Sequence, residues 1–590
     1  MVICGLKLTH DGSVAIVDNG KLVFCIEMEK LNNNPRYSSI ENTSVIENTL
    51  LKQGYRLEDI DFFAIDGWGG YSQDALAIQP RLSIGDSNNI LSIINKEENI
   101  SLRIAQYQER NLKDDILKPQ NYDDLIIDDK PTIVYDSFLH VTGHVMSAYC
   151  SSPFAQNRES SYILVWDGGM YPRLYFFDVE SKKIENLGPI CLLIGNIYTI
   201  FSQHFGPFKT KGNFAKDDLS IAGKVMAYIA LGNLRRELLP IFDEIYKETY
   251  NHPMGFANIF ANEFKKRIVG LNYSDEDILL SFHVFLEELL VDKLHKKIAR
   301  SGKINQNICI AGGCALNIKW NSAIRDSGVF KDVYVPPFPN DSGSAIGVAC
   351  AAMLNKTGRY HLDWSVYSGP DVIKNEPAEN WQKMPFSIKE LAYLLHETNE
   401  PVVLLNGKAE LGPRALGNRS IIGAASSLRM KDILNTIKQR ESYRPVSPIC
   451  LVECAEEIFE PGTQDPFMLF DHQVREHWID KLPAIMHLDG TARLQTVSEK
   501  HNKPLAQLLR AYQEITSIPV LCNTSANFNG KGFFPDIHSV TEWGGVNYVW
   551  SEDTLYFKKE VRPQQRIIQE TSKEYVFELE GIEEEIELFA

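Results

Sequence analysis

The sequence predicts an α/β protein that is divided into at least two domains. Its 590 residues are far more than one hydrophobic core usually organises. A strand–Asp-Gly–strand pattern occurs twice, at residues 2–17 and 160–179, and a strand followed by Gly-Gly and a helix occurs at 307–324. The two similar hairpins indicate a structural duplication within the first half of the chain.

The composition is that of an ordinary globular enzyme. Hydrophobic residues make up 44% of the chain and charged residues 23%. No apolar run approaches the roughly 20 residues that cross a bilayer, and the opening MVICGLKLTHDG is typical of a strand, not of a signal peptide. The ten cysteines stand singly without a CxxC pair, as in reduced cytosolic proteins. We therefore expect a cytoplasmic protein that does not bind membranes.

The charge distribution argues against nucleic acid as a partner and for a small anion. The net charge of −17 would repel a phosphate backbone. Residues 408–444 are the exception, with eight basic side chains against three acidic ones. A solvated helix face would explain Arg429 and Lys431, but Arg414 and Arg419 stand among glycines. Planar arginine side chains in such an island suit a phosphate ester.

Hydrophobic periodicity and turn residues predict the elements of the first half in order. Asn19-Gly20 is a strong signal for a hairpin after the second strand. The remaining predictions are strands at 2–7, 13–17 and 61–70, helices at 42–54 and 136–149, the hairpin of 160–179, and mostly helical sequence over 218–300.

A second domain is predicted to begin after residues 355–385, which are rich in Pro, Gly, Asn and Asp and have weak periodicity. We assign residues 1–370 to the first domain and 385–590 to the second. The second domain is predicted to open with a helix at 388–398 and a strand at 401–407, and to contain a strand at 518–525. The acidic tail, EYVFELEGIEEEIELFA, is interpreted as an edge strand or a loosely attached extension.

The glycine turns of the first half match the layout of the actin-like ATPase superfold. In that fold, two glycine turns face the nucleotide phosphates from opposite sides and a third loop receives the adenosine. Glycine lets backbone N–H groups approach phosphate oxygens without a Cβ in the way. Single Asp-Gly turns are common in plain hairpins, so the prediction depends on all three occurring in this order. The turn residues concerned are Gly12, Gly168, Gly169, Gly312 and Gly313.

Two histidines and two aspartates are candidate metal ligands. His140 and His144 are four residues apart in a helical segment, so both imidazoles lie on one helix face. Isolated pairs of this kind are usually surface or core histidines. Asp167, at the tip of the second hairpin, and Asp341, in the turn PFPNDSGSAIG, stand in loops expected to converge on the same cleft. A mixed N/O site suits Fe(II), Mn(II) or Zn(II), and the spacing does not choose among them.

Beyond these patterns, the chain resembles the O-carbamoyltransferase family that modifies antibiotics and other secondary metabolites, including the tobramycin, cephem and nodulation-factor enzymes. The combination of GPRALGNRS (412–420) with KQRE (438–441) and RP (444–445) is highly specific. NTSANFNG (523–530) and EMEKLNNNPRYSSI (27–40) are closer to the subgroup that acts on macrolactams. The other resembling stretches are HDGS (10–13), HVTGHVMSAYCSSPF (140–154), VWDGG (165–169), AGKVMAYIALG (222–232), IAGGCALN (310–317), PPFPNDSGSAIGVA (336–349) and HLDGTARLQTV (487–497).

The resemblance implies two linked activities. A C-terminal domain of the YrdC type would bind carbamoyl phosphate and ATP with Mg²⁺ and form carbamoyl-adenylate. The N-terminal actin-like (ASKHA) domain would hold the adenylate beside a divalent metal, expected to be Fe(II), and pass the carbamoyl group to a hydroxyl of a small molecule. The identity of this acceptor and the oligomeric state are not predicted.

The same resemblance implies roles for individual residues. His140, His144, Asp167 and Asp341 would bind the metal, and His10, with Asp11, would be the catalytic base. Lys224, Asn317 and the turn glycines would contact the nucleotide, and Arg414 would act in adenylation. Carbamoyl phosphate and ATP would be held by Arg414, Arg419, Lys438, Arg440, Arg444, His487, Asp489, Arg493, Asn523, Thr524 and Ser525.

Two other functions fit part of the sequence. An actin-like kinase or ATPase would use only the first half and would leave the basic island without a role. A nucleotide-binding protein of the tRNA-modification type is disfavoured by the acidic charge. Four aromatic residues follow loop-like sequence and are candidates for the acceptor site, although a core or surface role is more common for each: Trp68, Tyr71, Phe205 and Phe208.

Overall fold

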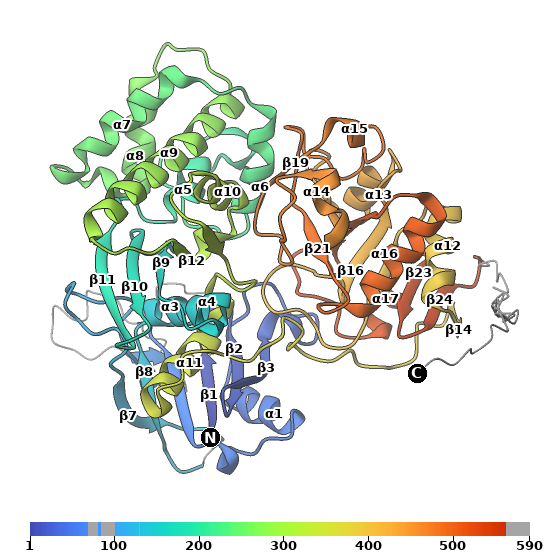
Figure 1. The fold of residues 1–590 in the computed structure, drawn as a ribbon, viewed down its shortest axis with the longest axis horizontal. Helices are drawn as coiled ribbons and strands as arrows, with labels where there is room; N and C mark the ends of the chain where they lie inside the picture. The colour runs from blue at the N-terminus through green and yellow to red at the C-terminus, as the bar shows by residue number, and fades with distance from the viewer. Residues whose placement is uncertain (69–80, 84–100, 129, 562–590) are drawn as a thin grey trace, which may run out of the picture.

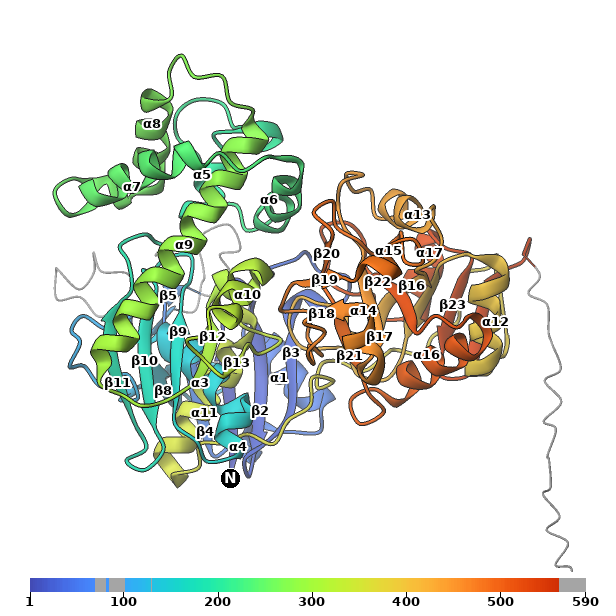
Figure 2. The ribbon, with the colours of Figure 1, turned by 45° about the horizontal axis from the view of Figure 1, so that its top comes forward.

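A computed structural model describes residues 1–68, 81–83, 101–128 and 130–561 (Figure 1). Its elements form two halves that lie side by side, one from the first 357 residues and one from residue 381 onward (Figures 1 and 2). The acidic tail and Tyr71 lie outside the described residues. Among the residues that are described, no helix is long and apolar enough to cross a membrane.

The described residues of the first half form two large sheets in which five strands follow the same order. In the first sheet, β3-β2-β1-β4-β8-β7, the hairpin strands are antiparallel and β1, β4 and β8 are parallel. The second sheet, β11-β10-β9-β12-β13, repeats this pattern. The predicted duplication is therefore confirmed. The strands of the first sheet are β1 (Val2–Lys7), β2 (Ser13–Asp18), β3 (Lys21–Glu27), β4 (Phe62–Asp66), β7 (Gln120–Leu125) and β8 (Ile133–Phe138). Those of the second are β9 (Ser161–Val165), β10 (Arg173–Asp178), β11 (Lys183–Pro189), β12 (Asn307–Ala311) and β13 (Asp332–Tyr334).

Two helices pack between these sheets and share a buried core with both: α3 (His140–Ser151) and α11 (Ser344–Thr357). They approach very closely, because a Cβ built on Gly347 would lie 1.8 Å from the carbonyl oxygen of Gly143. On the other side of α11, a Cβ on Gly5 of β1 would lie 2.0 Å from the carbonyl oxygen of Ala345. These glycines bring α3, α11 and β1 together at the level of the candidate metal ligands.

Helices also fill the segment between β11 and β12, as predicted for residues 218–300 (Figure 2). They are α5 (Ile197–Ser202), α6 (Ala222–Tyr228), α7 (Leu239–Lys247), α8 (Ala257–Arg267) and α9 (Asp275–Ser301). The predicted helix at 42–54 is α1 (Ser44–Lys52). The helix predicted across 136–149 is wrong in its first residues, because Asp136–Phe138 belong to β8. These three residues pair with β4 in the sheet, and the helix begins only at His140.

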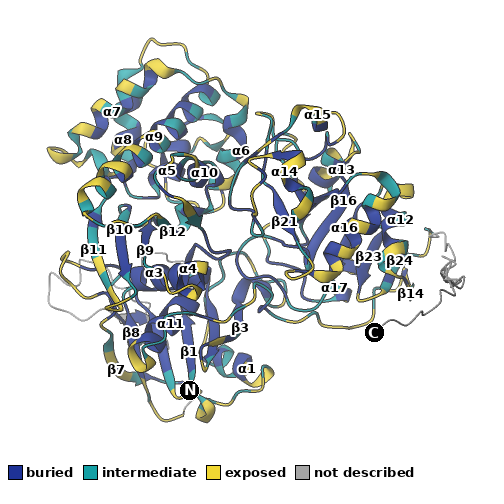
Figure 3. Cartoon of the chain, in the orientation of Figure 1, coloured by how far each residue is buried: buried dark blue, intermediate teal, exposed yellow. Residues whose placement is uncertain are grey.

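The second half is built on one mixed eight-stranded sheet with the order β14-β24-β23-β15-β16-β22-β17-β21. The sheet is buried on both faces, under α12 and α16 on one and α13 and α17 on the other (Figure 3). The predicted helix at 388–398 is α12 (Ile388–Thr398). The other helices are α13 (Met430–Ile437), α16 (Lys503–Thr516) and α17 (Ile537–Trp543). The strands are β14 (Trp381–Pro385), β15 (Val402–Leu405), β16 (Arg419–Ala424), β17 (Ser447–Leu451), β21 (Gln495–Val497), β22 (Val520–Ser525), β23 (Tyr548–Ser551) and β24 (Thr554–Lys558).

Candidate functional site

The four predicted metal ligands converge in one buried cluster. His140 and His144 lie in the first turns of α3, Asp167 follows β9, and Asp341 precedes α11. One ligand atom from each residue lies within 4.8 Å of the other three, and all four residues are buried. Asp341 Oδ1 is 3.4 Å from both imidazole Nε2 atoms, and these are 3.1 Å from each other. Ligands about 2.1 Å from one ion are separated by about 3 Å, so this set fits a divalent metal.

Charged groups behind the cluster hold two of its members in place. Lys7, at the end of β1, lies with its Nζ atom 2.9 Å from Asp66 Oδ2 and 2.9 Å from Asp341 Oδ2. Asp66, the last residue of β4, also accepts a hydrogen bond of 2.8 Å from His140 Nδ1. With neutral imidazoles, the three carboxylates of Asp66, Asp167 and Asp341 outweigh the single ammonium group by two charges. A divalent cation would balance that excess.

Electrostatics keep the ligand carboxylates ionised. Burial alone would raise the pKa of Asp341, but attraction to Lys7, and to His140 and His10 when these are protonated, holds its pKa well below the usual value. Burial and repulsion from Asp341 likewise act to raise the pKa of Asp167, and the two histidines more than offset them, so its pKa is lowered. Metal ligands must be deprotonated, and both aspartates meet this requirement at neutral pH.

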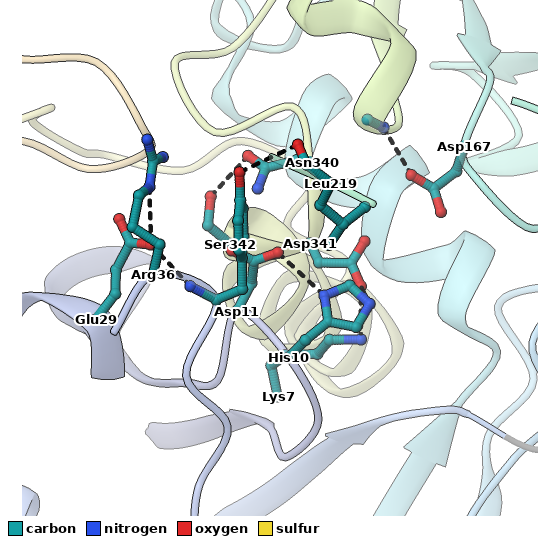
Figure 4. Close-up of polar contacts among 12 residues, drawn as sticks. Lys7, His10, Asp11, Glu29, Arg36, Asp167, Leu219, Asn340, Asp341 and Ser342 are labelled. Carbon is teal, nitrogen blue, oxygen red and sulfur yellow. Dashed lines mark hydrogen bonds and ion pairs between the residues drawn. The ribbon is translucent and has the colours of Figure 1, made fainter. Parts of the chain in front are cut away.

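His10 lies beside Asp341, one of the four clustered residues (Figure 4). Its Nδ1 atom is 3.1 Å from Asp11 Oδ2 and its Nε2 atom is 3.4 Å from Asp341 Oδ2. Burial acts to lower the pKa of His10, but Asp341 and Asp11 outweigh it, so the pKa is raised. Trp68 and Tyr107 form an aromatic wall here, with the Trp68 ring 5.0 Å from that of His10 and the Tyr107 ring 4.5 Å from that of His140. The Tyr107 hydroxyl also donates a hydrogen bond to Asp167.

The glycine turns are arranged differently from the predicted phosphate cradle. The N–H of Gly12 donates to the carbonyl of Ser38, and a Cβ on Gly12 would lie 2.8 Å from the Ile40 nitrogen. The N–H of Gly312 donates to Pro339, and that of Gly313 donates to the Asp167 carboxylate at 2.6 Å. These three glycines therefore serve close packing and ligand orientation, which corrects the expectation that their amides face phosphate.

The other predicted nucleotide contacts have mixed positions. The side-chain oxygen of Asn317 accepts from the N–H groups of Lys319 and Trp320, so Asn317 caps helix α10 (Ile318–Asp326), and a nucleotide contact of its side-chain NH₂ group stays a prediction. Gly168 has open space, since the nearest atom to an added Cβ would be 3.8 Å away, whereas Gly169 lies against the ring of Tyr107. Lys224 is half-buried in α6. A nucleotide role for Gly168, Gly169 and Lys224 stays a prediction.

A second site is a cavity between the two halves of the molecule. Arginines from both halves line it, among them Arg36 from the loop after β3 and Arg414 from the loop between β15 and β16. Helices α6 and α10 of the first half contribute Met226 and Lys319. The predicted residues that line this cavity are Arg414, Arg440, Arg444, His487, Asp489, Arg493, Asn523, Thr524 and Ser525.

The cavity carries positive charge with few carboxylates to balance it. Within the described residues, no carboxylate lies within ion-pair distance of Arg414, Arg440 or Arg493. Arg493 donates instead to Ser447 Oγ at 2.9 Å, and Arg440 donates to Thr524 Oγ1 at 3.0 Å. Burial lowers the pKa of Arg414, and the neighbouring Arg493 and Arg36 lower it further. Buried, mutually repelling guanidinium groups are stabilised when an anion binds between them.

The predicted roles of Arg419 and Lys438 in phosphate binding need correction. Arg419 is only 1% exposed, and its guanidinium donates to the backbone carbonyls of residues 370, 406, 407 and 418. Lys438 donates to the carbonyls of Ser525 and Asn527. Neither side chain lines the cavity, because both are used to hold the loops around it. Asp489 is also partly engaged, in an ion pair of 2.7 Å with Lys319.

Among the aromatic acceptor candidates, Trp68 lies at the metal cluster. Its ring packs under Lys7 Nζ at 4.0 Å and beside His10. Phe205 is buried in the core of the first half, and Phe208 packs edge-on against Tyr228 at 5.4 Å. The core interpretation therefore holds for Phe205 and Phe208.

Sequence reasoning missed Lys7, Asp66, Tyr107 and Arg36. Lys7 and Asp66 gave a usable signal, because each is a charged residue at the end of an otherwise apolar, buried strand. Arg36 and Tyr107 stand in irregular segments, and no local pattern distinguishes them from surface residues.

Comparison with known proteins matches both halves of the chain to one family. The family description "Carbamoyltransferase N-terminus" matches residues 2–350, and "Carbamoyltransferase C-terminus" matches residues 392–555. Nodulation protein U of Rhizobium tropici is 46% identical over 578 residues, covering 95% of this chain and 97% of that protein. The 3'-hydroxymethylcephem-O-carbamoyltransferase of Streptomyces clavuligerus is 30% identical, covering 94% and 99%. Since these matches span nearly its whole length, the chain belongs to the carbamoyltransferase family of enzymes.

Proposed function

We propose that this enzyme is an O-carbamoyltransferase that activates carbamoyl phosphate with ATP and transfers the carbamoyl group to a hydroxyl of a small molecule. The observation that carries the proposal is the presence of two distinct polar sites, the arginine-lined cavity and the His/Asp cluster. The name of the Streptomyces clavuligerus relative supports a hydroxymethyl-type acceptor class. The acceptor of this chain itself stays open.

In the first step, the arginine-lined cavity would bind the phosphate groups of carbamoyl phosphate and of ATP with its Mg²⁺. Arg414, Arg440 and Arg493 would neutralise the leaving phosphate and pyrophosphate, since forked guanidinium groups bind such oxygens in pairs. Water would cleave phosphate from carbamoyl phosphate to give carbamate. A carbamate oxygen would then bond to the α-phosphorus of ATP as pyrophosphate leaves, which gives carbamoyl-adenylate. The uncompensated positive charge of the cavity supports this assignment.

In the second step, the carbamoyl group would be transferred beside the His/Asp cluster. A metal ion held by His140, His144, Asp167 and Asp341, which we propose to be Fe(II), would supply Lewis-acid polarisation of the carbamoyl carbonyl. His10 would accept the proton of the acceptor hydroxyl at its Nε2 atom while Asp11 orients its Nδ1 side. The hydroxyl oxygen then bonds to the carbamoyl carbon, and AMP leaves.

We also propose a fold family for each half of the chain. We propose an actin-like ATPase fold for residues 1–370, supported by the repeated strand order of its two sheets. For residues 385–590 we propose a YrdC-type domain. A kinase would not require the arginine-lined cavity, and a tRNA-modifying role is disfavoured by the net charge of −17.

Product analysis tests the proposal. The protein is incubated with ATP and carbamoyl phosphate, and nucleotides and phosphates are separated and quantified. Pyrophosphate and AMP or carbamoyl-adenylate, formed only when carbamoyl phosphate is present, are expected; ADP alone would instead identify a kinase. Arg414→Ala should abolish pyrophosphate release, while His140→Ala should retain it and block transfer. Arg510→Ala, which removes an exposed, ion-paired arginine, is the matched control.

A further inference from the structure

Two ion pairs and one hydrogen bond behind the His/Asp cluster link two of its members, Asp341 and His140. Asp341 Oδ2 contacts Lys7 Nζ at 2.9 Å, Lys7 contacts Asp66 Oδ2 at 2.9 Å, and the same Asp66 oxygen is 2.8 Å from His140 Nδ1. The side chains of these four linked residues are each at most 4% exposed. Burying a charged side chain costs free energy unless the charge is paired. Because Lys7 and Asp66 are buried directly beside the His/Asp cluster, we expect their role to lie in that cluster.

The direction of the hydrogen bond determines which nitrogen of His140 faces the cluster. An ionised carboxylate only accepts hydrogen bonds, so His140 must carry a proton on Nδ1. In the neutral imidazole, Nε2 then carries the lone pair, and this atom lies 3.4 Å from Asp341 Oδ1 and 3.1 Å from His144 Nε2. The opposite tautomer would place a proton between the two histidines and close the space that a metal needs.

We propose that Asp66, held by Lys7, is a positioning residue of the metal centre that fixes His140 in the Nδ1–H tautomer and aims its Nε2 atom at the metal. Lys7 also contacts Asp341, a second candidate ligand, directly. By engaging Oδ2 of Asp341, it leaves Oδ1 directed toward both histidines. This inference rests on the proposed metal site.

The decisive variant is Asp66→Asn, which keeps the size of the side chain and removes the obligatory acceptor. Zn(II) affinity is measured on the full chain by competition with a chromogenic chelator. Removal of such an outer carboxylate is expected to weaken Zn(II) binding by about 10- to 100-fold. His144→Gln, which removes a direct ligand, provides the reference for loss of the site.

Asp277→Asn is the matched control. Asp277 is also a buried aspartate in an ion pair, 2.6 Å from Arg235, but it belongs to α9 and not to the His/Asp cluster. This variant should bind Zn(II) like the parent protein. Equal Zn(II) affinity of Asp66→Asn and the parent would overturn the positioning role while leaving the metal site intact. Absence of Zn(II) binding by the parent would overturn the metal site and this inference together.

A measurement on the unaltered protein covers the case in which Asp66→Asn does not fold. The imidazole ¹⁵N–¹H spectrum of the Zn(II)-loaded protein, with the His140 signals assigned from their loss in His140→Gln, shows which nitrogen carries the proton. A proton on Nδ1, with Nε2 shifted by the metal, is expected. A proton on Nε2 would contradict the proposal whatever the affinity.

Discussion

The Nε2 atoms of His140 and His144 face each other at 3.1 Å across the start of α3. Two buried imidazoles at this distance cannot both be protonated on the facing nitrogens without repulsion. The helical spacing of four residues brings the rings to one face, and the carboxylate of Asp341 lies 3.4 Å from both. The arrangement is that of ligands around one ion.

His144→Gln should separate the two proposed steps. The variant loses one ligand, so carbamoyl transfer to an added acceptor is expected to fall by at least about 100-fold. Pyrophosphate release that depends on carbamoyl phosphate should stay within about threefold, because the arginine-lined cavity contains none of the four metal ligands. Both rates are measured on the same preparation, and a parallel loss of the two would refute separate sites.

Arg419→Ala should affect stability and not substrate binding. Its guanidinium bonds four backbone carbonyls in a buried setting, so its removal is expected to lower the free energy of unfolding by about 3–5 kcal/mol. At a temperature where the variant stays folded, the KM for carbamoyl phosphate should change less than about threefold. Chemical denaturation measures the free energy of unfolding, and steady-state kinetics measure the KM. Arg414→Ala is expected instead to abolish pyrophosphate release with little change in the free energy of unfolding.

Gly347→Ala should loosen the metal site from a distance. The added Cβ would lie 1.8 Å from the Gly143 carbonyl, so α3 and α11 must move apart, and the histidines move with one helix and Asp341 with the other. A lower Tm and weaker Zn(II) binding are expected. Gly223→Ala serves as the control for Tm, because a Cβ there meets no atom within 4 Å. An unchanged Zn(II) affinity would show that the spacing between α3 and α11 does not determine metal binding.

Glu287→Gln should stabilise the protein at neutral and alkaline pH and have no effect at pH 4.5. Burial raises the pKa of Glu287 from 4.5 to about 7. The folded state therefore holds this proton where the unfolded state has lost it, and stability falls as pH rises from about 4.5 through 7. The variant should gain up to about 3 kcal/mol at pH 8, reduced by the 28% exposure of the side chain, and nothing at pH 4.5. Thermal unfolding at the two pH values is compared, with the exposed Glu288→Gln as control.

Much of the candidate site could be predicted because its members carry local signals. The HxxxH spacing, the Asp-Gly turn of the second hairpin and the turn before α11 each stand at an element boundary. The structure brings these residues together. Three arginines of the basic island, Arg414, Arg440 and Arg444, line one cavity, whereas Arg419 and Lys438 donate to backbone carbonyls. The sequence pattern marks a basic island and cannot distinguish a guanidinium directed at a ligand from one directed at backbone carbonyls.

The sequence alone indicated the α/β class, the repeated hairpins and the four candidate metal ligands that cluster in the fold, since periodicity, turn residues and motif spacing are properties of neighbouring residues. Only the tertiary structure decided which side chains support them. Lys7 and Asp66 are 59 residues apart and meet because β1 and β4 pair in parallel. Arg36 lines the cavity between the two halves together with residues of the second half only because the halves pack against each other. Contacts between distant segments depend on how sheets and helices pack, and no local pattern encodes them.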